Sequence, residues 1–359
     1  MDKTEEKVKD KFKEYYEKNS IEIPDINKRE FGIGSWDKKI EMRHLSFNTD
    51  QDLNTYLKKD IPFYISHSSA YYLYPEMRPM EKKEWFGADL IFDLDANKTG
   101  DIINDLKEVK DRTIHLVEDF LLTDFGFSKK DLNINFSGSN GYHIHIRNEK
   151  IRELDRKERR EIVEYINGTG LNLDSIIKKT GDGKFIGPTP NDHGYRGRLA
   201  RFVMNNPERY KPIKAKEKLF ADNWKNVLKN GNWTMIMKSI KKQKLEEDLL
   251  SLGVNLSQDI DVNVTIDLAR LIRVPNTLHA GSSLCAIKIR DLNSFEPLKD
   301  AIVFSDKEID YEIEIIENIK EMEFNNKTYT SFKKGDKIKT EENYALFLLC
   351  KRYAKINKN

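Results

Sequence analysis

The chain of 359 residues contains 38% hydrophobic and 34% charged residues and carries a formal net charge of +2, so it can bury a core and is not a uniformly basic coat protein. Its two cysteines, Cys285 and Cys350, exclude a disulfide framework and a four-cysteine zinc site, and they suit a reducing, intracellular compartment. No apolar run is long enough to span a bilayer, and the charged opening MDKTEEKVKD does not resemble a secretory signal. We therefore expect a cytoplasmic protein without membrane contact.

The pattern of hydrophobic residues predicts mixed α and β structure. In chain order, the predicted elements are a helix near 8–16, strands at 40–47 and 88–95, a helix at 101–122, strands at 132–136 and 142–146 around the turn 137–141, a charged helix at 152–166, a helical region at 205–256, a strand at 261–266, a short helix at 268–273, a strand at 283–289 and a helix at 344–356. We interpret residues 205–256 as a helical insertion, and residues 1–204 together with 257–359 as one core.

Two aspartates stand out on the strand predicted at 88–95. Asp93 and Asp95 are two residues apart and so point to one face, while the alternate apolar residues point to the other. Two adjacent carboxylates repel each other unless a cation lies between them, and Mg²⁺ or Mn²⁺ prefers such oxygen ligands. A solvated strand face would explain the same pattern, because a single DxD sequence is a weak signal.

A site for two metal ions needs a third carboxylate, and Asp261 and Asp267 are the candidates. Strand spacing does not separate them. Asp267 directly precedes the predicted helix at 268–273, where an N-cap aspartate has a structural role. Asp261 begins a strand and has no comparable role, so we favour Asp261 as the ligand.

Phosphate-binding groups are predicted in the segment SGSNGYHIHI. Its two glycines permit close backbone approach, Ser137 and Ser139 supply hydroxyls, and His143 and His145 share one face of the strand. A simple hairpin with two partly buried histidines would fit the same residues, and so would a metal site of the HxH type.

Further basic groups lie in RLIRVPNTLHAGSS, which presents Arg270, Arg273 and His279 around a proline turn. Such groups can hold a triphosphate, although basic turns are common on protein surfaces. Two basic runs, at 147–160 and 238–244, are most simply explained as solvated helix faces, and a nucleic-acid track is the less frequent explanation for each.

Together, these segments resemble the small subunit of archaeo-eukaryotic DNA primases, in content and in order, from about residue 28 to about 290. The matching segments are IEMRHLSF, FDLDA, SGSNGYHIHI, GYRGR and DVNVTIDLARLIRVPNTLH. The resemblance implies a primase catalytic core of two packed sheets with flanking helices and an RRM-like portion. It implies that Asp93 and Asp95 bind catalytic metal ions. The family's third aspartate lies upstream of the histidine in the LH element, which points to Asp261, eighteen residues before His279.

The resemblance also implies how the substrate is held. Ser137, His143, Arg273 and His279 match positions that contact the incoming nucleotide, and Arg43 matches a basic residue near the same pocket. The implied reaction is template-directed nucleotidyl transfer with two Mg²⁺ or Mn²⁺ ions as cofactors. The implied partners are NTPs and possibly dNTPs, a single-stranded DNA template and a large primase subunit, within replication machinery at the nucleoid.

One departure from the family pattern concerns zinc. Small subunits often carry a zinc knuckle soon after the DxD strand, but between Asp95 and Phe136 this chain has no cysteine and a single histidine, His115. We therefore expect no structural zinc, because such a site needs four closely spaced ligands.

Other functions would use some of the same residues. A repair or translesion polymerase of the same superfamily, which extends existing ends, would carry the same motifs. A non-catalytic nucleic-acid-binding subunit would not need the three-aspartate set. A metallohydrolase built on His143 and His145 would leave the RLIRVPNTLH segment unexplained.

Overall fold

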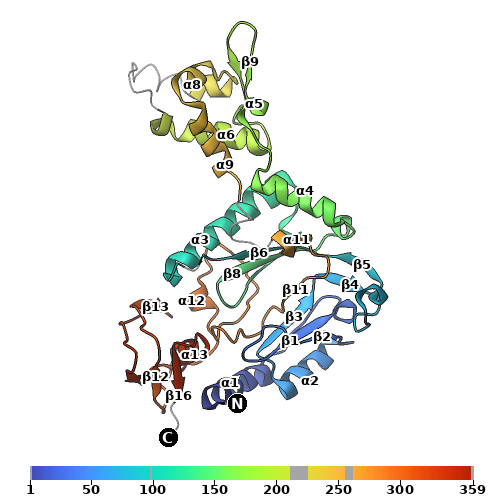
Figure 1. Ribbon diagram of the computed structural model, residues 1–359, viewed down its shortest axis with the longest axis vertical. Coiled ribbons are helices and arrows are strands. Elements are labelled where there is room, and N and C mark those ends of the chain that lie inside the picture. Colours follow the sequence, from blue (N-terminus) through green and yellow to red (C-terminus); the bar gives the residue numbers. More distant parts are fainter. Residues whose placement is uncertain (1, 98, 211–224, 255–261, 357–359) are drawn as a thin grey trace. The chain divides into compact units, whose positions relative to one another are not determined.

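The computed structural model describes residues 2–97, 99–210, 225–254 and 262–356, which form two compact units (Figure 1). Unit 1 comprises Met1–Ile114, Lys130–Arg159 and Asp259–Asn359, and unit 2 comprises His115–Lys129 and Arg160–Gln258. The helical insertion predicted at 205–256 lies within unit 2, which also contains segments that precede it in the chain.

The centre of unit 1 holds two antiparallel sheets. The first has the strand order β6-β8-β7, with β6 at Leu90–Asp95, β8 at Gly141–Ile146 and β7 at Leu132–Phe136. The alternate apolar residues of β6 are fully buried, as their period-two spacing predicted. The register places Asp93 opposite His143 and Asp95 opposite Gly141, so strand pairing alone brings the aspartate pair beside the histidine motif.

The second sheet has the strand order β11-β3-β1-β2, with β11 at Leu271–Arg273, β3 at Tyr64–Ser68, β1 at Phe31–Gly34 and β2 at Met42–Leu45. Strand β11 comes from a distant part of the sequence and pairs with β3 so that Arg273 lies opposite Ser66. This pairing carries the predicted arginine to the centre of the unit.

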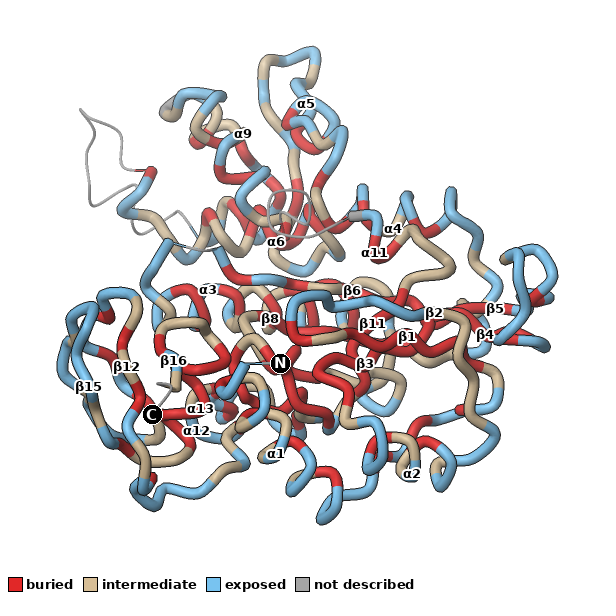
Figure 2. Tube along the Cα trace, turned by 60° about the horizontal axis from the view of Figure 1, so that its bottom comes forward, coloured by how far each residue is buried: buried red, intermediate tan, exposed pale blue. Residues whose placement is uncertain are grey.

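Buried side chains join the two sheets. Ile91 of β6 packs with Ile272 of β11 and with Val264, and the rings of His67 and His145 lie 5.8 Å apart. Figure 2 shows buried chain along β8, β1, β3 and β11, whereas the edge strand β2 is largely outside the buried interior of unit 1. The predicted mixed α and β fold with a two-sheet core is confirmed.

Helices and short strands surround these sheets. The elements are α1 (Lys3–Lys18), α2 (Asp50–Asp60), α3 (Ile102–His115), α11 (Val262–Ile266), the single-turn helices η1 (Ile26–Lys28), η2 (Met80–Lys83), η4 (Lys129–Asp131) and η5 (Glu149–Ile151), and the paired strands β4 (Ala70–Tyr72) and β5 (Trp85–Ala88). Helix α1 buries Val8, Phe12 and Tyr16 at helical spacing, and the Tyr16 hydroxyl accepts a hydrogen bond from the Leu278 amide. The N-terminal helix therefore supports the loop that carries His279.

The C-terminal part of unit 1 is a set of short elements. They are α12 (Pro297–Asp300), β12 (Ile313–Ile315), β13 (Met322–Phe324), β14 (Lys327–Tyr329), β15 (Lys337–Ile338), α13 (Glu342–Cys350) and β16 (Ala354–Ile356). Strands β15, β12 and β16 form one sheet, and β13 pairs with β14.

Four local predictions of secondary structure are wrong, one of them the helix at 344–356, whose last residues form the strand β16 (Ala354–Ile356). Residues 262–266 form the helix α11 rather than a strand, and Leu271–Arg273 form a strand rather than part of a helix. The sequence LARLIR favours a helix, but its last residues complete the edge of the sheet beside β3, and tertiary pairing overrides this weak propensity. Residues 283–289 form isolated bridges instead of a strand, at Cys285 and Lys288.

Unit 2 is mainly helical. Its elements are the π-helical turn η3 (Leu116–Asp124), most of α4 (Arg156–Asn167), α5 (Leu173–Ile176), α6 (Gly194–Asn205), η6 (Pro207–Tyr210), α8 (Thr234–Ser239), α9 (Lys242–Ser251), and a hairpin of β9 (Lys178–Lys179) and β10 (Phe185–Ile186). Its core includes the buried Trp233, whose indole N–H donates to the carbonyl of Pro188. Within the described parts of both units, none of the helices has the length and apolar character that crossing a membrane requires.

Candidate active site

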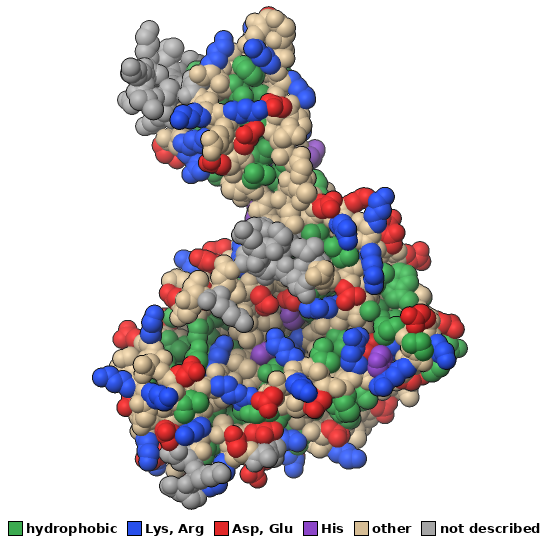
Figure 3. All heavy atoms as spheres, viewed as in Figure 1, with side chains coloured by type: hydrophobic (Ala, Val, Ile, Leu, Met, Phe, Trp, Pro, Cys, Tyr) green, Lys and Arg blue, Asp and Glu red, His purple; other side chains and the backbone are tan. Residues whose placement is uncertain are grey.

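A cavity of about 280 Å³ opens in unit 1 where β6, β8, β3 and β11 meet. Figure 3 shows acidic, basic and histidine side chains gathered near the middle of one face of this unit. The predicted site residues that line the cavity are Arg43, Asp93, Asp95, Ser137, His143, Arg273 and His279. Asp261, the remaining predicted residue, lies outside the described residues.

The carboxylates of β6 form the acidic wall. Asp93 is partly exposed and lies 3.4 Å from Nε2 of His143, measured from its Oδ1 atom. Asp95 is exposed at the end of the strand, beside Gly141. A Cβ atom on Gly141 would lie 2.3 Å from the carbonyl oxygen of Leu94 and 2.6 Å from a carboxylate oxygen of Asp95, so glycine is required for the turn to approach the end of β6 this closely.

The turn 137–141 supplies a hydroxyl whose orientation is fixed. Ser137 Oγ accepts hydrogen bonds from the amides of Gly141, at 3.1 Å, and Ser139, at 3.4 Å. A hydroxyl that accepts in this way still has its own hydrogen to donate. Gly138, at φ +81°, lets the turn pack against the backbone and Cβ of the 279–286 loop. Ser137 can therefore donate to an anion in the cavity.

Arg273 is a buried cation without an acidic partner in the described residues. It is 8% exposed, and its Nη1 atom is buried with no hydrogen-bond partner among these residues. Its guanidinium carbon lies 4.9 Å from the ring centroid of Tyr64. Burial lowers the pKa of Arg273 to about 10, so the group still carries its charge at neutral pH. An anionic ligand would satisfy it.

His279 is held beside Arg273 in a defined tautomer. The amide of Gly281 donates to His279 Nδ1 at 3.0 Å, so a neutral ring carries its proton on Nε2. Burial, and then the charge of Arg273, hold the pKa of His279 well below its ordinary value. The edge of the same ring meets Tyr64, with centroids 5.2 Å apart. Tyr64 thus contacts both Arg273 and His279, which line the cavity.

Arg43 lines the same cavity but already has a partner. Its Nε donates to Glu30 Oε1 at 3.0 Å, and the Glu30 side chain is fully buried. Lys83 lies 3.4 Å from the other oxygen of Glu30. Glu30 therefore orients Arg43, whose side chain is 40% exposed and can still reach a ligand.

Asp267 also lines the cavity. The prediction that it caps a following helix is wrong, because the strand β11 follows and Asp267 instead ends α11. Its carboxylate accepts from the amide of Ala269 at 2.9 Å. The structural role that argued against Asp267 as a metal ligand is therefore reduced to one local hydrogen bond. Asp261 and Asp267 both remain candidates for the third carboxylate.

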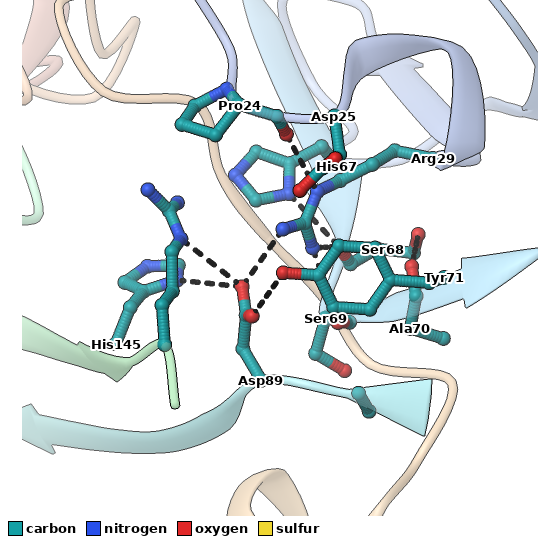
Figure 4. A network of polar contacts seen from close by, with 12 residues as sticks. Pro24, Asp25, Arg29, His67, Ser68, Ser69, Ala70, Tyr71, Asp89 and His145 are labelled. Carbon is teal, nitrogen blue, oxygen red and sulfur yellow. Dashed lines mark hydrogen bonds and ion pairs between the residues drawn. The ribbon is translucent and has the colours of Figure 1, made fainter. Parts of the chain in front are cut away.

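The two histidines of β8 have different surroundings. His143 lines the cavity, whereas His145 is fully buried near Asp89 and His67 (Figure 4). Asp89 Oδ2 lies 4.0 Å from His145 Nδ1, 2.9 Å from Arg29 and 3.3 Å from Arg147. His145 does not line the cavity that His143 enters, and no group of three potential metal-ligating side chains is found in the described part of the chain.

The Asp89 cluster is a buried support behind the cavity. Tyr71 donates to Asp89 Oδ1 at 2.5 Å, and Arg29 also donates to the carbonyls of Ser68 and Ser69. Burial raises the pKa of Asp89, but Arg29 and its other partners lower it further, so this pKa lies below its ordinary value. The cluster ties the beginning of β6 to the end of β3.

Sequence reasoning missed three polar residues of the cavity. Lys39, Ser66 and Asn140 all line it. Lys39 lies in a segment without a motif, and Ser66 sits within an apolar strand that gave no functional signal. Asn140 lies inside the glycine turn, and closer attention to its amide could have identified it.

The carboxylates are of the chemical type that hard divalent cations prefer as ligands. Asp93, Asp95 and Asp267 all line the cavity, but the described side chains do not form a group of three potential metal ligands. The opposite groups are cationic or hydrogen-bond donors, as a triphosphate requires. A paired-carboxylate strand facing such a cavity is the arrangement of a nucleotidyltransferase.

Comparisons with known proteins agree with this class. The family model described as the DNA primase small subunit matches residues 92–291. The DNA primase small subunit PriS of Methanococcoides burtonii is 35% identical, over 86% of this chain and 88% of its own. The proteins of the same name from Archaeoglobus fulgidus and Methanocella arvoryzae are 33% and 32% identical, over 96% and 98% of both chains. The chain belongs to the DNA primase small-subunit family, and it is a nucleotidyltransferase.

Proposed function

We propose that the unit 1 cavity catalyses template-directed synthesis of short primers from nucleoside triphosphates, as the catalytic subunit of a DNA primase. The observation that supports this most strongly is the convergence of separate motifs. Residues from the segments 40–47, 88–95, 137–146 and 268–279 line one cavity of about 280 Å³.

The triphosphate would bind to the basic wall. Arg273 offers a buried guanidinium, His279 offers its Nε2 proton, and Ser137 offers its hydroxyl. These donors are held by neighbouring groups before substrate arrives, so little reorganisation accompanies the developing charge on the leaving phosphates. His143 and Arg43 complete the nucleotide contacts in this proposal.

Asp93, Asp95 and Asp261 would hold two Mg²⁺ or Mn²⁺ ions, with Asp267 as the competing third carboxylate. When bound, such ions lower the pKa of the attacking 3′-hydroxyl and stabilise the leaving pyrophosphate. The family resemblance supports Asp261, and the lining of the cavity supports Asp267.

The partners belong to the same proposal. A primase acts on a single-stranded DNA template and takes NTPs, and possibly dNTPs, as substrates. The names of the relatives describe small subunits, which supports pairing with a large primase subunit. Work at the nucleoid with other replication proteins would follow from this activity.

Asparagine variants test the site. Asp93→Asn and Asp95→Asn should reduce templated synthesis by about 10²-fold or more, without a change in Tm, because each removes a charge that holds the catalytic ions. Asp261→Asn should do the same, while Asp267→Asn should retain most activity. Full activity of Asp261→Asn together with an inactive, folded Asp267→Asn would transfer the third ligand to Asp267.

A further inference from the structure

One end of unit 2 carries lysines that the proposed chemistry does not use. Several exposed lysines of unit 2 form no ion pair within the described residues, and we call five of them the lysine surface: Lys178, Lys179, Lys229, Lys238 and Lys241. The basic run at 238–244 contributes two of them. Lys244, from the same run, instead donates to the carbonyl of Arg209.

Backbone pairing brings these segments together. Lys178 of β9 pairs with Ile186 of β10, and Ile186 forms a bridge with Asn232, three residues after Lys229. At the other side, Lys242 at the start of α9 forms an ion pair with Asp174 of α5, the helix that leads into β9. The five lysines therefore lie on segments that are neighbours in the fold, rather than on one helix face.

Acidic residues of the same segments do not neutralise the lysine surface. Asp182 in the hairpin turn pairs with Lys184 at 2.7 Å, and Asp174 and Glu246 pair with Lys242. The charge balance thus leaves several positive charges without a counter-charge. Figure 3 shows lysine and arginine side chains scattered over the visible face of this unit, with some acidic side chains between them.

The chemistry of these side chains selects one kind of partner. Lysine ammonium groups are point charges on flexible stems, so they suit a repeating line of phosphates and do not read base edges. Ile186, which is 57% exposed beside Lys178, adds an apolar contact for sugars or bases. A primase site must accept templates of any sequence, which such contacts allow.

We infer that the lysine surface of unit 2 binds the phosphodiester backbone of the nucleic acid on which the enzyme works, independently of base sequence. This inference rests on the proposed function and adds a second contact, separate from the nucleotide cavity. The same phosphates occur in a single-stranded template and in a primer–template duplex.

Fluorescence anisotropy with the full chain tests the inference, in the absence of nucleotides and divalent ions. The probes are labelled oligo(dT) and a labelled primer–template duplex, each titrated at several salt concentrations. For Lys178→Glu/Lys179→Glu we expect about tenfold weaker binding to oligo(dT) and a salt slope smaller by about 1.4, since each phosphate contact on a single strand contributes about 0.7. If binding becomes weaker for only one of the two probes, that probe shows whether the lysine surface binds the single strand or the duplex.

Matched variants separate charge from folding. Lys178→Arg/Lys179→Arg keeps the charge and should bind as the parent does. Lys229→Glu/Lys241→Glu reverses charge outside the hairpin and should weaken binding similarly. Lys333→Glu/Lys334→Glu, an exposed pair in unit 1, should have little effect. Parent-like affinity and salt slope in both reversed unit 2 variants, or an equal loss in the unit 1 pair, would overturn the inference.

The outcome is independent of the proposed activity. Primer synthesis by the unaltered chain is measured separately. If the chain synthesises primers and the charge-reversed variants bind DNA as the parent does, only the inference about the lysine surface is refuted. If the chain binds DNA through these lysines but does not synthesise primers, the proposed function is refuted instead.

Discussion

Arg273 provides a prediction in which stability and activity respond differently. The substitution Arg273→Met keeps most of the side-chain volume but removes a guanidinium that is 8% exposed and unpaired in the described residues. A buried charge without a partner is unfavourable to folding, so its loss should leave the Tm unchanged or raise it. Removing a structural ion pair would have the opposite effect.

The magnitude for substrate binding follows from the hydrogen bonds that are lost. A hydrogen bond to a charged group contributes about 1.5–3 kcal/mol. Because about 1.4 kcal/mol corresponds to a factor of ten, the nucleotide KM should rise about 10- to 150-fold. The effect on kcat should be smaller, since the phosphates are already bound in the ground state.

Steady-state primer synthesis with varied nucleotide, together with thermal unfolding, measures both effects. Arg43→Met is the matched comparison, because it leaves the buried Glu30 without one of its cationic partners and should lower the Tm. A destabilised Arg273→Met enzyme with an unchanged KM would refute the assignment of Arg273 to the triphosphate.

Two further predictions concern the residues around the cavity. Asp89→Asn should destabilise the chain by about 3–5 kcal/mol at neutral pH, because Arg29 and Arg147 lose their buried counter-charge. The pKa of Asp89 is lowered in the fold, so its stabilising contribution is complete above the unfolded pKa of about 3.9 and is lost as the pH falls through the lower, folded value. The free energies of unfolding of parent and variant, measured in urea, should therefore converge in acid. A difference that widens in acid would contradict this reasoning. Tyr64→Leu should raise the nucleotide KM with little change in kcat, because it removes the ring that contacts Arg273 and His279. Tyr64→Phe keeps this ring and should resemble the parent. Equal effects of both variants would exclude a positioning role of the ring.

Part of this site was predictable because its signals are local. Asp93 and Asp95 alternate with apolar residues on a buried strand, and a glycine turn precedes His143, so strand spacing alone indicated their faces. The antiparallel register then brings Asp93 beside His143.

The parts that were missed depend on distant pairing. The segment 262–273 contains both a short helix and a short strand, and each took the opposite form to its local propensity because of contacts with β6 and β3. Ser66 enters the cavity only because β3 pairs with β11. The choice between Asp261 and Asp267 rested on that misassigned helix, and composition could not correct it.

The most direct measurement is synthesis on an unprimed single-stranded template by the purified chain, with Mg²⁺ or Mn²⁺, comparing NTPs with dNTPs and adding its large-subunit partner. We predict short complementary products that begin without any primer and disappear in the folded Asp93→Asn variant. Extension only when a primer is supplied would identify an end-extending polymerase instead. Undiminished synthesis by Asp93→Asn would contradict the placement of the chemistry in this cavity.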